Sequence, residues 1–163
     1  MILDDLLRKF RIVDLPQHEI ENFNRAWHRL KPWRDARRGL RELKRHHVIA
    51  TLSNGNVALL TNMAKSTGLP WDCILSAELF NHYKPDPEVY HGAARLLGLA
   101  NDEVMMVAAH KDDLFAAKSC GLRTAFVARP REYGSKAKLD VSAEPAFDFN
   151  ASNFLDLARQ LGG

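Results

Sequence analysis

The sequence is poor in the residues that build metal clusters, disulfide frameworks or membrane spans. Its only two cysteines, Cys73 and Cys120, lie 47 positions apart, which gives little support to a disulfide framework or a zinc finger. The longest apolar run covers only 104–109, whereas roughly 20 residues are needed to cross a bilayer. Asp4 and Asp5 stand where a secretory signal would be basic. We therefore expect a cytoplasmic protein with no membrane partner.

The net charge of the chain is also small, because its 23 Lys and Arg residues nearly balance its 20 Asp and Glu residues. The basic residues are nonetheless concentrated, since 25–47 holds nine of them against Asp35 and Glu42. Leu30, Leu40 and Leu43 give this segment the pattern of an amphipathic helix with a solvated basic face. We favour that interpretation over a nucleic-acid interface and expect no nucleic-acid partner.

The chain has an ordinary globular composition, with 46% hydrophobic and 26% charged residues, and a length typical of one domain. Helical periodicity covers the first part of the chain, at 3–11, 17–30 and 35–46. Short apolar runs then alternate with helical patterns, the runs lying at 48–52, 73–75, 104–109, 124–127 and 146–149. This alternation predicts an α/β fold, with a parallel sheet covered by helices on both faces.

Polar residues follow several of the predicted strands. Ser53 and Asn54 follow the first, 110–113 follow the third, and Arg129 follows the fourth. The segment 83–87 would bring Lys84 to the same rim. Since ligands bind beyond the carboxyl ends of strands in such sheets, these residues predict an anion-handling site.

Three ordered segments, 51–55, 82–90 and 106–114, resemble the haloacid dehalogenase superfamily, and most nearly its type II 2-haloacid dehalogenases. The resemblance covers roughly 1–135 and is tightest over 40–131. It implies a Rossmann-like core with a helical cap. By this resemblance, 1–34 would be a remnant of the cap with its return linker, and 35–163 an incomplete core.

The resemblance also implies hydrolysis of a carbon–halogen bond in a small 2-haloacid. In that family an aspartate on the first, central strand attacks the halogen-bearing carbon, and water hydrolyses the resulting ester. Ser53 matches the residue that steadies this nucleophile, and Asn54 the residue that helps hold halide or substrate carboxylate. Lys84 matches the lysine that offsets negative charge, and Asp113 the aspartate that orients this lysine and the water.

Two further residues are expected to bind substrate, and none to bind a metal. Tyr90 matches a tyrosine that lines the family's pocket. His110 stands where many relatives have asparagine, so it could bind a carboxylate or water, or be purely structural. Superfamily phosphatases carry an acidic Mg²⁺ ligand at the position of Ala109, and alanine cannot coordinate a hard cation. The resemblance therefore implies metal-free chemistry with no cofactor, and a Mg²⁺-dependent phosphatase is the alternative.

The family's first motif, a strand running into Asp-x-x-Gly-Thr, is absent from the sequence. Asp4 and Asp5 are the nearest candidates, but we interpret them as first-turn residues of a helix. We therefore expect an N-terminally truncated chain that lacks the nucleophile and is inactive alone. Its core strands would have unpaired edges, or pair across the gap, and such edges favour aggregation, homo-oligomers or strand addition.

Simpler interpretations apply to each motif taken alone. Ser53 could be a helix N-cap, Lys84 a surface lysine, and Asp112 with Asp113 the capping residues of a helix. Their joint occurrence in family order favours a site. A non-catalytic binding remnant is the further alternative, supported by the missing nucleophile.

Overall fold

The computed structural model describes residues 2–12, 15–134 and 139–162. Helices come first: α1 (Ile2–Lys9), α2 (Gln17–Asn24), the 3₁₀ turn η1 (Arg25–Arg29) and α3 (Ala36–Leu43). Strands and helices then alternate through β1 (Ala50–Ser53), α4 (Val57–Thr67), β2 (Cys73–Ser76), η2 (Ala77–Phe80), α5 (Pro87–Leu97), η3 (Asn101–Glu103), β3 (Met105–Ala108), α6 (Lys111–Ser119), β4 (Arg123–Val127), β5 (Phe149–Ala151) and α7 (Phe154–Gln160). This order confirms the α/β class.

The strands form two parallel sheets. In one, β1 pairs with β2, with Ala50 opposite Cys73. In the other, β4 lies between β3 and β5, with Met105 opposite Arg123 and Ala125 opposite Phe149. Among the described residues no ladder joins β1 to β3, so each keeps one edge without a paired strand. Of the two expectations, unpaired edges rather than pairing across the gap describe this chain.

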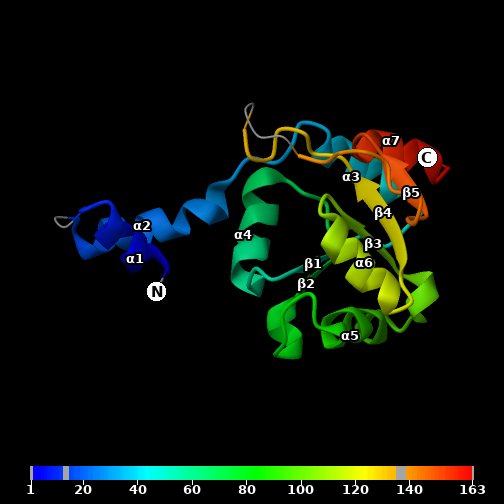
Figure 1. Cartoon of the computed structure of the whole chain (residues 1–163), viewed down its shortest axis with the longest axis horizontal. Coiled ribbons are helices and arrows are strands. Elements are labelled where there is room, and N and C mark those ends of the chain that lie inside the picture. The colour runs from blue at the N-terminus through cyan, green and yellow to red at the C-terminus, as the bar shows by residue number, and fades with distance from the viewer. Residues whose placement is uncertain (1, 13–14, 135–138, 163) are drawn as a thin grey trace.

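Helices cover both faces of the three-stranded sheet (Figure 1). Ala125 and Val127 of β4 pack with α3 and α7 in one hydrophobic cluster, which includes Leu40 and Leu157. Phe126 belongs to a second cluster, built with residues of α5 and α6. Successive side chains of a strand point to opposite faces, so β4 contributes to both clusters.

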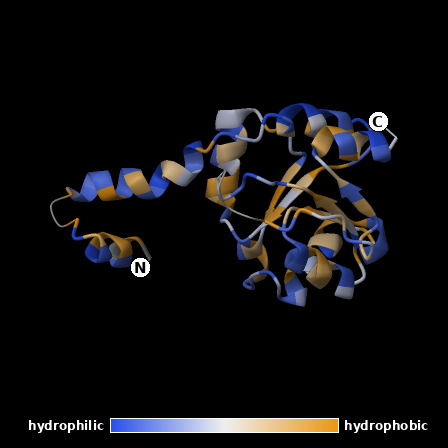
Figure 2. Cartoon of the chain, turned by 45° about the horizontal axis from the view of Figure 1, so that its top comes forward, coloured by the Kyte–Doolittle hydropathy of each residue, from blue (hydrophilic) through white to orange (hydrophobic). Residues whose placement is uncertain are grey.

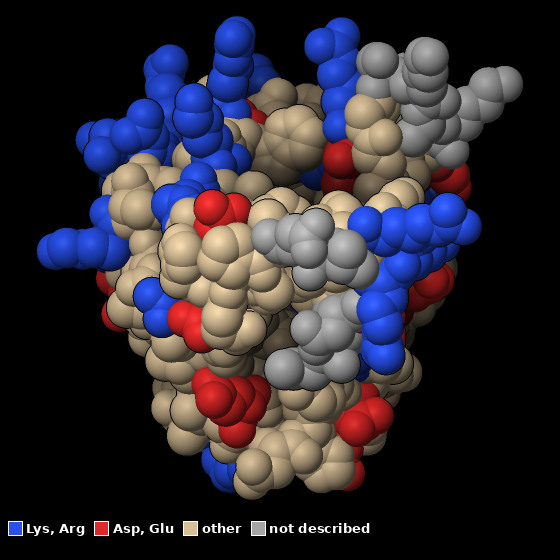
Figure 3. Space-filling model, turned by 90° about the vertical axis from the view of Figure 1, so that its left-hand side faces the viewer, with Lys and Arg blue, Asp and Glu red and all other residues tan. Residues whose placement is uncertain are grey.

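The α3 helix shows why the basic segment is a surface. Leu40 and Leu43 are buried, whereas Arg37, Arg38 and Arg41 are exposed. This burial confirms the amphipathic pattern. Lys and Arg side chains gather at the upper left of the face shown in Figure 3.

The helices that precede α3 extend away from the sheets (Figure 1). The helix expected over 17–30 is α-helical only to Asn24 and continues as the 3₁₀ turn η1, a common ending for a helix. No residue of α2 or η1 is buried, and the hydropathy colouring of Figure 2 marks hydrophobic residues along these exposed helices. Asp4 and Asp5 lie within α1, as the helical interpretation predicts.

Some element boundaries differ from the prediction. The first strand begins at Ala50 rather than Val48, because Val48 is 71% exposed and the Ile49 N–H donates to the side chain of Asp72. The last strand is β5 rather than 146–149, because Phe147 is buried in the core and its N–H donates to the Glu144 carbonyl in a turn. Among the described residues, no helix is long and apolar enough to cross a bilayer.

Candidate active site

A cavity of about 670 Å³ opens at the carboxyl ends of β1, β3 and β4. It is lined by five of the six residues predicted for the site, namely Asn54, Lys84, Tyr90, His110 and Asp113. These residues come from the loop after β1, the loop before α5, α5 itself and the start of α6. The parallel arrangement of the strands therefore brings the three motifs, which are separate in the sequence, to one end of the fold.

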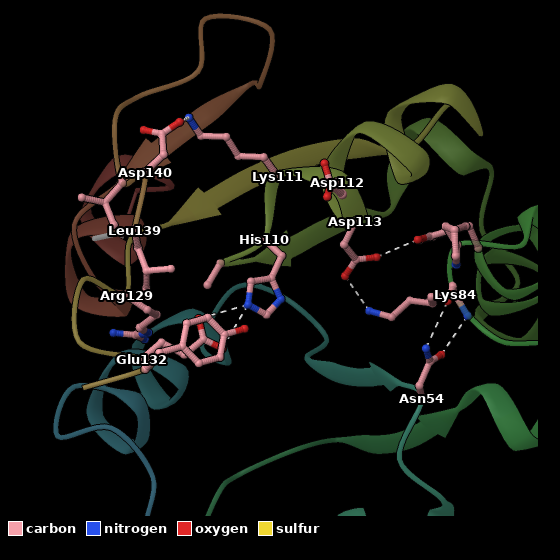
Figure 4. Close-up of a pocket in the computed structure, with 15 residues that line it drawn as sticks. Asn54, Lys84, His110, Lys111, Asp112, Asp113, Arg129, Glu132, Leu139 and Asp140 are labelled. Carbon is pink, nitrogen blue, oxygen red and sulfur yellow. Dashed lines mark hydrogen bonds and ion pairs between the residues drawn. The ribbon is translucent and has the colours of Figure 1, made fainter. Parts of the chain in front are cut away.

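The centre of the site is an ion pair between Lys84 and Asp113 (Figure 4). Lys84 Nζ lies 2.6 Å from Asp113 Oδ2, and the side chains are 15% and 17% exposed. The Tyr90 hydroxyl donates to the other carboxylate oxygen, Oδ1, at 2.6 Å. Burial raises the pKa of Tyr90 far above its usual value, and the hydrogen bond to Asp113 raises it further. Tyr90 therefore remains a proton donor to a fixed carboxylate at physiological pH.

Asn54 holds the loop that carries this lysine. The Asn54 side chain accepts from the Lys84 backbone N–H at 2.8 Å and donates to the Lys84 carbonyl at 3.1 Å. Both halves of the amide are thus used to fix the backbone of Lys84 beside the end of β1. The expected contact with halide or carboxylate stays a prediction, whereas this role in positioning Lys84 was not foreseen.

Ser53 is the predicted residue that does not line the cavity. Its Oγ accepts from the Gly55 N–H at 3.0 Å, which shapes the turn after β1. The alternative that Ser53 caps α4 is wrong, because the N-cap is Asn56, whose side chain accepts from the Leu59 N–H. The capping alternative for Asp112 and Asp113 is also wrong, since both lie inside α6 and His110 occupies the N-cap position.

Two side-chain pairs on the opposite wall were missed from the sequence. His110 Nε2 lies 3.0 Å from both carboxylate oxygens of Glu132, and Lys111 Nζ lies 2.6 Å from Asp140 Oδ2. The hydrogen bonds from Lys111 and Ser142 hold the pKa of Asp140 well below its usual value. No local pattern indicated Glu132 or Asp140, because their partners are 22 and 29 residues away.

Arg129 lies at the back of the cavity and is only 8% exposed. Its two terminal nitrogens each lie 3.0 Å from one carboxylate oxygen of Asp35, and its guanidinium stacks 5.1 Å from both Trp33 and Phe154. Burial raises the pKa of Asp35, but hydrogen bonds from Arg129 and the Phe154 N–H outweigh it and lower the value overall. The sequence placed Arg129 only after the fourth predicted strand, and the structure buries it against the cavity.

The metal-ligand grouping found in the described part of the chain lies outside this cavity. Among the described residues, the group of three that could hold an ion is His82, Asp86 and Glu88, which is exposed at the start of α5. Ala109 also lines the cavity, and its methyl group offers no oxygen to a cation.

Comparison with known proteins places this geometry in a family. Haloacid dehalogenase-like hydrolases match residues 2–121. The chain belongs to this family. The (S)-2-haloacid dehalogenase 4A of Burkholderia cepacia is 36% identical over 114 residues, which make up 66% of this chain and 49% of that protein.

Solved structures of this family have the same architecture. The L-2-haloacid dehalogenase PA0810 superposes with a TM-score of 0.94 at 50% identity, over 98% of this chain and 70% of that one. The defluorinating L-2-haloacid dehalogenase Rha0230 gives 0.95 at 43% identity, over 99% of this chain and 66% of that one. The chain spans about half the length of the curated relatives that it matches.

Proposed function

We propose that this site acts in the hydrolysis of the carbon–halogen bond of a 2-haloacid. The observation that carries the proposal is the part-buried Lys84–Asp113 pair, completed by the Tyr90 hydroxyl, at the carboxyl ends of parallel strands. The relatives whose chains match this one are named as 2-haloacid dehalogenases. Ala109 favours this chemistry over Mg²⁺-dependent phosphoryl transfer, because it removes an oxygen ligand from the site.

The reaction has two steps. An aspartate oxygen forms a bond to the halogen-bearing carbon as the carbon–halogen bond breaks and halide leaves. Water then cleaves the ester, which restores the carboxylate and releases a 2-hydroxy acid and a proton. The Lys84 ammonium balances the negative charge that gathers at the reacting centre. Asp113, held by Lys84 and Tyr90, orients this lysine and the water.

The attacking carboxylate is proposed to come from outside the described cavity. Asp113 and Asp140 are each paired with a lysine, Glu132 lies 3.0 Å from His110 Nε2, and the remaining lining carboxylate, Asp112, is exposed. The unpaired edges of β1 and β3 offer a place for an extended segment that would carry the missing aspartate. The chain alone is therefore expected to be inactive.

Halide release tests this proposal directly. Chloride from 2-chloropropionate and fluoride from fluoroacetate would be measured without metal, with and without a peptide copying the first strand and Asp motif of a dehalogenase. We expect no release from the chain alone and release in the presence of the peptide, abolished in Lys84→Ala but retained in Lys118→Ala. Equal release from the chain alone and from Lys84→Ala would contradict the proposal.

Two controls separate the alternatives. Hydrolysis of p-nitrophenyl phosphate only when Mg²⁺ is present would favour the phosphatase. Binding of a haloacid without turnover, even with the peptide, would favour a non-catalytic remnant. Circular dichroism of each variant establishes that a lack of release is not a lack of folding.

A further inference from the structure

The described lining of the cavity carries more negative than positive charge when His110 is neutral. Its cations are Lys84, Lys111 and Arg129, and each lies within 3.0 Å of a carboxylate oxygen. Its carboxylates are Asp112, Asp113, Glu132 and Asp140. A 2-haloacid is an anion at neutral pH, so it would enter a site whose positive groups are already paired. An additional positive charge in the lining would favour the binding of this anion.

His110 is the group in this lining that can supply that charge near neutral pH, because an imidazole ordinarily titrates close to pH 6.5. Its Nε2 lies 3.0 Å from both oxygens of Glu132, and the side chains are 58% and 28% exposed. In Figure 4 the ring lies between Glu132 and the Lys84–Asp113 pair, with its second nitrogen turned toward that pair. The Nδ1 atom therefore faces the cavity while Nε2 is held from behind.

We propose that the His110–Glu132 pair binds the carboxylate of the acid, and that this binding is coupled to the uptake of a proton. The pair takes up one proton from solvent on binding, so that Nε2–H donates to Glu132 and Nδ1–H donates to the ligand. This inference rests on the proposed function for the chemical class of the ligand. It adds a role for Glu132 and a coupling between binding and protonation.

The charges around His110 explain why uptake would accompany binding. Glu132, Asp112 and Asp113 favour the imidazolium, whereas Lys84 and Arg129 across the cavity oppose it. The N-terminus of α6, where His110 is the N-cap, also opposes a cation. The carboxylate of a bound acid adds one more negative charge beside the ring, which favours the imidazolium and would draw a proton from solvent.

Calorimetric titration with L-lactate tests this, because a 2-hydroxy acid binds without reacting. We expect the affinity of the wild-type chain for lactate to rise as the pH is lowered from 8 to 6. The rise should be at most about tenfold per pH unit, which is the limit for the uptake of one proton. Titrations at pH 7.5 in two buffers of different ionisation heat should show uptake approaching one proton. Ring ¹⁵N NMR should show His110 as the Nε2–H tautomer at pH 8, and as the doubly protonated ring with lactate at pH 7.5.

Variants make the assignment specific. His110→Gln should bind lactate weakly with no dependence on pH, and Glu132→Gln should need a lower pH for the same affinity. His47→Gln, at an exposed histidine after α3, should behave as wild type. Equal affinity at pH 6 and pH 8 without proton uptake, wild-type binding by His110→Gln, or no binding at 20 mM lactate and pH 6 would each overturn the inference. The halide-release assay reads out the proposed function separately.

Discussion

The two sheets of this protein differ in how completely the rest of the chain surrounds them. In the three-stranded sheet, β4 is paired on both sides and four of its five residues are buried. In the two-stranded sheet, every residue of β1 is half-buried, and α4, which packs beside β2, has no buried residue. β4, with two neighbouring strands and both faces covered, forms part of the core, whereas β1, within the described part of the chain, is paired on one side only and is half-buried.

The candidate site joins these two unequal halves. Asn54 and Lys84 belong to the side of β1 and β2, whereas Asp113 and His110 begin the helix after β3. The Lys84–Asp113 ion pair therefore crosses from the weaker sheet to the stronger one. We expect the half with β1 and β2, which carries Lys84, to unfold first. The variants below test this difference in stability.

Arg129→Ala should have the largest effect, because it breaks the pair that holds α3 and α7 to the end of β4. It leaves the Asp35 carboxylate, which is 16% exposed, without its cation. We expect the free energy of unfolding to fall by about 3 kcal/mol, measured by urea denaturation. Arg131→Ala, at an exposed arginine of the same loop, should change it by less than about 0.5 kcal/mol. If the free energy of unfolding changed by a similarly small amount in both variants, the pair between Arg129 and Asp35 would not be what stabilises this half.

Acidic pH should lower the stability of the half that contains the three-stranded sheet. Burial raises the pKa of Asp148, but hydrogen bonds from the N–H and hydroxyl of Thr124 outweigh it, so its pKa and that of Asp35 both lie below their usual values. A carboxyl whose pKa is lowered by folding stabilises the protein above its unfolded pKa and loses this effect as pH falls. Stability should therefore hold near neutral pH and decline below about pH 4. Asp148→Asn should make this decline shallower; an unchanged acid slope would exclude Asp148 as a cause.

Thr51→Val should have the smallest effect and act on the weaker half. The Thr51 hydroxyl donates to the Leu75 carbonyl at 2.9 Å and accepts from the Leu75 N–H at 3.1 Å, which ties β1 to β2. Its loss should cost about 1 kcal/mol. Hydrogen exchange should quicken for amides of β1 and β2 but not of β4, and Thr61→Val on the exposed face of α4 should change neither. Uniform acceleration in all strands would show that the halves unfold together.

Much of the fold was predictable because its signals are local. Apolar runs alternating with helical periods located every strand to within a few residues, and Gly68 and Gly98 end α4 and α5 as expected for left-handed C-caps. The errors fell at Val48 and Phe147, where an apolar residue next to a strand is not part of it. Whether such a residue pairs depends on a distant neighbour, which periodicity does not contain. The division into a cap remnant, 1–34, and a core, 35–163, stays a prediction.

The candidate site divides in the same way. The sequence by itself determined the residue types and their order, so Asn54, Lys84, Tyr90, His110 and Asp113 could be named from three short motifs. Only the tertiary structure decided what each side chain contacts, including the hold of Asn54 on the Lys84 backbone and the pairing of His110 with Glu132. Those contacts join residues that lie 22 to 30 positions apart in the sequence. The distances between these residues depend on how the strands and helices pack against one another.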